Sequence, residues 1–177
     1  MAKPEIDSLM LQLQQGDEDA FEKIYTETER ALFSYILSLC RNYHTAEDLL
    51  QTTYIRLRTT ISNYKVGANG YAWLYTIAKN ATLNEMKRQK RESLTDVEEH
   101  VSKFGSYEMQ EESSLTSLMN RILNDNEREI VTLHISGFRH REIAEIMEKP
   151  MGTVLWTYNN ALAKLKRALQ REGEDEV

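Results

Sequence analysis

Residues 137–169 constrain the fold more than any other stretch, because they predict two helices joined by a short turn. Pro150 and the run 152–154 (Gly-Thr-Val) open the second helix. Its apolar positions recur at helical spacing and are Val154, Tyr158, Ala161, Leu162, Leu165 and Leu169. This pattern is typical of a helix-turn-helix, whose second helix normally enters the major groove of DNA.

The opposite face of that second helix is mostly polar. It carries Thr153, Trp156, Thr157, Asn160, Lys164 and Arg167. Asn160 can pair with an adenine edge, and Lys164 and Arg167 can hold phosphates. The alternative is an amphipathic helix that ends a bundle and turns a solvated face outward. The preceding helix and the Pro-x-Gly-Thr-Val entry favour DNA.

The remaining sequence predicts further helices and no strand. Helices are expected over 7–15 and 18–39, after a cap at Thr45, and from Tyr71 to a basic end at 87–91. Residues 62–70 predict a loop, and 115–123 and 126–136 predict two more helices. We therefore predict an all-α fold with two small domains, an N-terminal helical bundle (7–91) and a C-terminal helix-turn-helix unit (115–170). A flexible acidic linker (92–114) is expected to join them.

Charge is distributed unevenly along the 177 residues, whose net charge is −6. The acidic segment 92–112 and the acidic tail 171–177 account for this negative charge, and the rest of the chain carries 20 basic and 17 acidic residues. Strong unaided DNA binding usually needs a larger positive field. A partner that helps to hold the DNA is therefore expected.

Several classes of protein are disfavoured by what the sequence lacks. Its single cysteine, Cys40, excludes an internal disulfide and a multi-cysteine zinc site. The four histidines are scattered, and we find no phosphate-binding glycine loop and no nucleophile beside an evident base. We expect no catalytic site, metal or cofactor. The absence of a signal peptide and of a bilayer-length apolar run predicts a cytoplasmic chain without membrane insertion.

Four segments together resemble the extracytoplasmic-function (ECF) sigma factors, the compact sigma-70-type specificity subunits of bacterial RNA polymerase. They are Gly-Asp-Glu-Asp-Ala-Phe at 16–21, Ala-Glu-Asp-Leu-Leu-Gln at 46–51, Ala-Trp-Leu-Tyr-Thr-Ile-Ala-Lys-Asn at 72–80 and Gly-Thr-Val at 152–154. The resemblance implies that the first domain binds core polymerase and the minus-ten promoter element. It implies that the second binds the polymerase flap and the minus-thirty-five element. An anti-sigma protein is expected as a further partner by analogy.

The resemblance also assigns residues to these roles. Asp48 and Gln51 are expected to contact core polymerase. The minus-ten contacts are expected among Tyr64, Tyr71, Trp73, Lys79, Asn80, Lys87 and Arg88. For Trp73 we favour packing, and for Tyr64 or Tyr71 base contact. Thr153, Trp156, Thr157, Asn160 and Lys164 are expected to face the upstream element.

The chain departs from the family pattern at several positions. Gly70 replaces an apolar residue, which predicts a more mobile loop, and Arg139 replaces the usual Ser or Thr cap. Glu148 stands where the turn normally has glycine. Residues 155–160 include no basic residue, whereas the family commonly has basic residues there. Two other functions therefore stay open, an autonomous helix-turn-helix regulator and a sigma-like interaction protein that does not read DNA.

Overall fold

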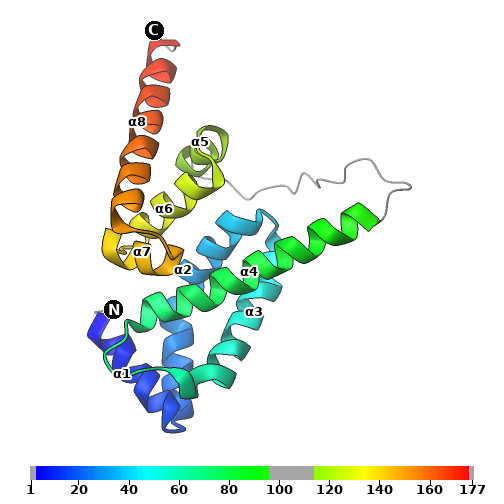
Figure 1. Cartoon of the computed structure of the whole chain (residues 1–177), viewed down its shortest axis with the longest axis vertical. Helices are drawn as coiled ribbons and strands as arrows, with labels where there is room; N and C mark the ends of the chain where they lie inside the picture. The colour runs from blue at the N-terminus through cyan, green and yellow to red at the C-terminus, as the bar shows by residue number, and fades with distance from the viewer. Residues whose placement is uncertain (1–2, 96–113, 176–177) are drawn as a thin grey trace.

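The computed structural model describes residues 3–95 and 114–175, and these ranges contain helices and no strand, which confirms the all-α prediction. The first half comprises α1 (Lys3–Gln14), α2 (Glu18–Cys40), α3 (Tyr43–Thr60), the 3-10 turn η1 (Ile61–Asn63) and α4 (Gly70–Thr95). The second half comprises α5 (Ser114–Ile122), α6 (Asp125–Ile135), α7 (His140–Met147) and α8 (Met151–Asp175). Most of the predicted linker, 96–113, lies outside the described residues (Figure 1).

Several helix boundaries differ from the prediction, including the start of α1 at Lys3 rather than residue 7 and the end of α8 at Asp175 rather than near residue 170. The cap of α3 is Asn42 rather than Thr45, because the Asn42 side chain accepts a hydrogen bond from the backbone N–H of Thr45 at 2.9 Å. Helix α4 continues past residue 91 to Thr95. An ion pair one turn apart, Arg88 with Glu92 at 3.0 Å, supports this extra turn.

One apolar core joins the two halves. Ile24, Leu57 and Leu74 from the first half belong to the same buried cluster as Ile130 and Ile143 from the second. A smaller cluster holds α5 and the second part of α8 against α6, and it contains Leu118, Met119, Leu123, Val131, Ala161 and Leu165. Helices α6 and α7 therefore lie against the first half, while α8 extends away from it (Figure 1). We call this docked state the closed arrangement.

Candidate nucleic-acid interface

The outward face of α3 is open to a partner. Asp48 and Gln51 are exposed, while Leu49 and Leu57 on the other face are buried in the core. Ile55, one turn beyond Gln51, is 63% exposed and extends the same face. Sequence reasoning missed Ile55, although an apolar residue outside the helical stripe was a visible signal. The face combines a carboxylate, an amide and an apolar side chain.

The loop before α4 is held by α1. The hydroxyl of Tyr64 donates to Asp7 at 3.2 Å and to the carbonyl of Ala68 at 2.7 Å. The Gln14 amide donates to three carbonyl oxygens of this region, those of Ile61, Ser62 and Tyr64. Tyr64 is only 4% exposed, which departs from its expected contact with a base. Its ring packs beside Trp73, with centroids 5.3 Å apart.

Gly70 is buried at the start of α4, where the sequence suggested a mobile loop. Its N–H donates to Asp7 at 2.6 Å. A Cβ at this position would lie 3.0 Å from the Asp7 carboxylate and 3.1 Å from Met10, so α1 leaves little room for any side chain. The glycine therefore allows close packing of α1, an element that sequence reasoning did not connect with this loop.

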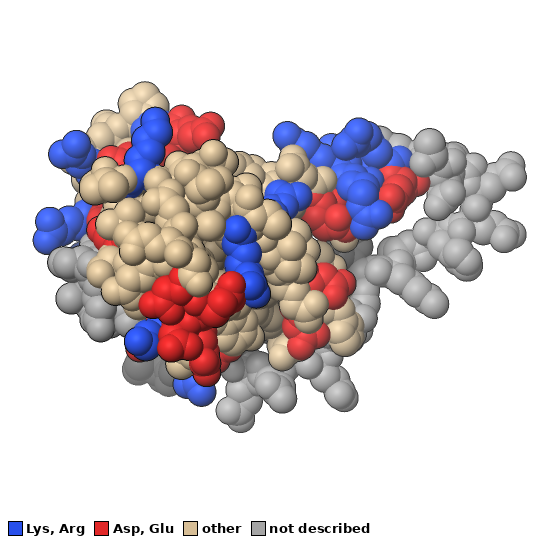
Figure 2. Space-filling model, turned by 90° about the horizontal axis from the view of Figure 1, so that it is seen from below, with Lys and Arg blue, Asp and Glu red and all other residues tan. Residues whose placement is uncertain are grey.

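The predicted polar DNA contacts of α4 divide into two groups. Lys79 is 12% exposed in its side chain and pairs with Glu129 of α6 at 3.1 Å. Asn80 and Lys87 are exposed. Arg88 is also exposed and lies between Glu85 at 2.7 Å and Glu92 at 3.0 Å. Figure 2 shows Lys and Arg side chains gathered at the far end of α4, so this end can meet a phosphate backbone in the closed arrangement.

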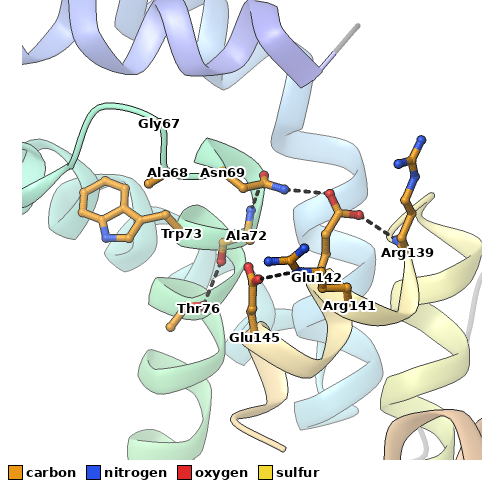
Figure 3. A pocket seen from close by; sticks show the side chains of 10 residues that line it. All are labelled: Gly67, Ala68, Asn69, Ala72, Trp73, Thr76, Arg139, Arg141, Glu142 and Glu145. Atoms are coloured by element: carbon orange, nitrogen blue, oxygen red, sulfur yellow. Dashed lines mark hydrogen bonds and ion pairs between the residues drawn. The ribbon is translucent and has the colours of Figure 1, made fainter. Parts of the chain in front are cut away.

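The start of α4 meets the start of α7 through two capping side chains (Figure 3). Asn69 accepts from the N–H of Ala72 at 3.1 Å, and Glu142 accepts from the N–H of Arg139 at 2.7 Å. The two caps are themselves joined, because the Asn69 amide donates to Glu142 at 2.7 Å. Glu142 thus satisfies the N–H of Arg139, whose own side chain has no oxygen with which to cap α7. A cavity of about 520 Å³ lies at this seam, with Trp73 on its wall.

Aromatic packing closes the same seam. Tyr71 is partly buried, and its ring centroid lies 6.5 Å from that of Phe138. The ring of Tyr75 approaches Phe138 more closely, at 4.7 Å. Of the aromatic residues predicted among the minus-ten contacts, Tyr71 and Trp73 thus keep partial exposure, while Tyr64 is enclosed.

The second helix of the helix-turn-helix, α8, presents its first turns to solvent. Thr153 and Trp156 are exposed and Asn160 is partly exposed, as the predicted reading face requires. Thr157 is 5% exposed and packs into the core, so its predicted place on that face is wrong for this arrangement. Lys164 is engaged by Glu127, with Nζ 2.7 Å from Oε1.

The described residues were also compared with what a metal site, a reactive thiol and a membrane-spanning helix require. No group of three His, Cys, Asp or Glu side chains gathers there as a metal would require. Cys40 is partly buried, and burial raises the pKa of its thiol. Every helix in the described ranges is too short or too polar to cross a bilayer.

Comparison with known proteins agrees with this geometry. Residues 24–92 match the sigma-70 region 2 family. The ECF sigma factor EcfG of Rhodopseudomonas palustris is 26% identical over 151 residues, which cover 82% of this chain and 83% of EcfG. SigW of Bacillus subtilis is 26% identical over 175 residues, which cover 90% of this chain and 94% of SigW. A co-crystal structure of the sigma factor RpoE with the anti-sigma factor NepR from Bartonella quintana has a TM-score of 0.70 at 26% identity, covering 85% of this chain and 96% of RpoE. Residues 24–92 therefore belong to the sigma-70 region 2 family, and the similarity of most of the chain to ECF RNA polymerase sigma factors supports an ECF-type sigma subunit.

Proposed function

We propose that this chain directs core RNA polymerase to promoters through two separate units. Residues 7–91 bind the polymerase clamp and the minus-ten element, and residues 115–170 bind the flap and the upstream element, with 92–114 as the linker. The observation that carries the proposal is a region 2 match on the same chain as a helix-turn-helix with exposed first turns of α8. Neither unit needs a cofactor, a metal or a catalytic group, and the chain acts in the cytoplasm.

Contact with core polymerase is proposed through the outward face of α3. Asp48 can accept charge-assisted hydrogen bonds from arginines, and Gln51 adds an amide. Ile55, one turn beyond Gln51, adds exposed apolar area to an otherwise polar face. The same surface lies away from the packed seam between the halves, so polymerase can reach it in the closed arrangement.

Promoter opening then requires two movements. The second half must separate so that Lys79, which is covered by α6, can meet DNA, and α1 of the first half must move to expose the buried Tyr64. We propose that binding to core polymerase supplies the free energy for this step. Extracting a base costs a few kcal/mol, and stacking one on an aromatic ring returns roughly 1–3 kcal/mol. Capture of one or two bases, with Lys87 and Arg88 near the backbone, then favours a small bubble.

An anti-sigma protein is proposed as a second partner. Support comes from RpoE, a relative of similar fold that was crystallised with such a protein. A pull-down from cells should return core polymerase together with a small inhibitory protein. Recovery of polymerase alone would count against this partner.

Run-off transcription tests the proposed function. The chain is mixed with core polymerase that lacks sigma, on a library of promoter fragments, and start sites are mapped. Initiation at defined sites only when both are present supports the proposal. Tight operator binding without polymerase would support an autonomous regulator instead. Binding to core without initiation would support an interaction protein that does not read DNA. The absence of Lys and Arg from residues 151–163 favours this option.

A further inference from the structure

The exposed start of α8 has an unusual surface for a DNA-reading helix. Between Met151 and Ala163 it contains no Lys or Arg. Trp156 is 68% exposed and Leu155 is 41% exposed. Large apolar side chains in such exposed positions usually mark a binding surface when they cluster.

These side chains share one arc of the helix. Gly152, Trp156 and Asn159 lie one turn apart, with Thr153 and Asn160 beside them. All are exposed except Asn160, which is partly exposed, and Val154 and Ala161 on the opposite arc are fully buried. Trp156 therefore stands in the middle of the solvent-facing arc, flanked by two amides.

Gly152 gives an independent indication that something approaches this arc. A Cβ at this position would meet no atom within 4 Å, and the residue does not have a positive φ. Neither packing within the described chain nor backbone conformation requires glycine there. A glycine in a helix costs up to about 1 kcal/mol relative to alanine. Close approach of an external surface is a physical reason for it.

We propose that these first turns of α8 form a reading surface for A·T base pairs, made of Thr153, Leu155, Trp156, Asn159 and Asn160. Apolar side chains recognise the thymine methyl group in the major groove, and asparagine pairs with the adenine edge. The strongest guanine contact, a bidentate arginine, is not available here. The upstream element of this factor is therefore rich in A·T pairs, with thymine methyls under Trp156. This inference rests on the proposed function.

Replacing thymine with uracil tests the proposal, because uracil lacks only the 5-methyl group. Holoenzyme made from this chain and core polymerase first selects promoters from a library with a randomised upstream element. Enrichment of A·T pairs in that element is expected. The selected promoter is then made with uracil in place of upstream thymines. Wild-type holoenzyme should lose about fourfold in affinity per contacted methyl, equivalent to about 0.8 kcal/mol.

Variants locate the effect. Trp156→Ala should weaken binding to the thymine promoter and abolish the difference between thymine and uracil. Leu169→Ala, which removes a 55% exposed apolar side chain near the other end of α8, should keep that difference. Because Trp156 is exposed, circular dichroism of its variant should match wild type.

The possible failures are distinguishable. Selection of G·C-rich elements, or equal wild-type binding to thymine and uracil promoters, overturns the A·T reading while transcription itself persists. Weaker binding of Trp156→Ala to core polymerase in the absence of DNA would assign the surface to protein docking and overturn it as well. Failure to transcribe any promoter in the library overturns the proposed function, and this inference with it.

Discussion

The ammonium of Lys79 lies 3.1 Å from Oε1 of Glu129, with only 12% and 10% of the two side chains exposed. The same oxygen accepts a hydrogen bond from Tyr35 at 2.8 Å. The neighbouring Arg128, also buried, donates to the carbonyl of Ser38 near the end of α2 at 3.2 Å. Lys79, which was predicted to contact promoter DNA, is thus paired with an acid of the second half of the chain.

Removing the acid of this pair should open the closed arrangement. Glu129→Ala leaves the Lys79 ammonium buried without its carboxylate, and breaking a buried pair typically costs about 3–5 kcal/mol. Separation of the halves relieves that cost by hydrating the ammonium. Pairs of spin labels on α2 and α8 should therefore report longer and broader distances in the variant.

A surface pair provides the matched control. Glu18 and Arg58 are joined at 2.7 Å, but their side chains are 65% and 49% exposed. Such pairs contribute about 0–1 kcal/mol, so Glu18→Ala should leave the label distances unchanged. Identical distances in wild type and Glu129→Ala would show that the Lys79–Glu129 pair does not hold the halves together.

The faces of single helices were predictable, and the contacts between them were not. Helical spacing placed Val154, Ala161 and Leu165 in the core, and they are buried. The same spacing does not show which other helix packs over a polar face that the pattern assigns to solvent. Lys79 is covered by α6, and Tyr64 is held by α1, through pairings 50 and 57 residues apart in sequence.

Local chemistry was ambiguous where two signals compete. Asn42 and Thr45 are both good caps, and only the backbone path decides that Asn42 serves α3. Thr157 lies at the border between the apolar stripe and the polar face of α8, so the pattern allows it to be either buried or exposed. Its burial depends on how α6 and α7 pack against α8, which a single-helix pattern does not contain.

Alkaline pH should destabilise the protein through Tyr75. Burial raises the pKa of this hydroxyl to about 12, whereas a tyrosine in an unfolded chain ionises near pH 10. Above about pH 10 the unfolded state therefore releases its proton first, and stability falls as pH rises, by up to about 1.4 kcal/mol per pH unit for this residue. Urea unfolding over this pH range measures the slope.

Phenylalanine substitutions separate Tyr75 from the other buried tyrosines. Tyr75→Phe keeps the ring against Phe138 but removes the ionisable group, so its stability should fall less steeply with pH. Tyr43→Phe, at a ring that is 48% exposed, should follow the wild-type curve. Equal slopes for Tyr75→Phe and wild type would contradict the prediction.

Glycine at position 148 should stabilise the helix-turn-helix. Glu148 ends α7 with φ 51° and ψ 43°, a left-handed conformation that costs a residue with a side chain roughly 1–2 kcal/mol. Glycine relieves this strain but loses about 0.4–1 kcal/mol through greater freedom of the unfolded chain. Glu148→Gly should therefore gain up to about 1.6 kcal/mol in urea unfolding. Glu145→Gly, inside α7, should instead lose about 1 kcal/mol; a loss in both variants would show that the turn tolerates Glu148 without strain.

Reversing the charge of Asp48 should weaken binding to core polymerase far more than it changes folding. The side chain is exposed, so Asp48→Arg should alter the unfolding free energy by no more than about 0.5 kcal/mol. If its carboxylate accepts charge-assisted hydrogen bonds worth about 1.5–3 kcal/mol, affinity for sigma-free core should fall at least about tenfold. Glu27→Arg, at an exposed acid of α2, makes the same charge change elsewhere and should bind like wild type. Biolayer interferometry against immobilised core polymerase measures the affinities of both variants. Unchanged affinity of Asp48→Arg would remove this residue from the polymerase interface.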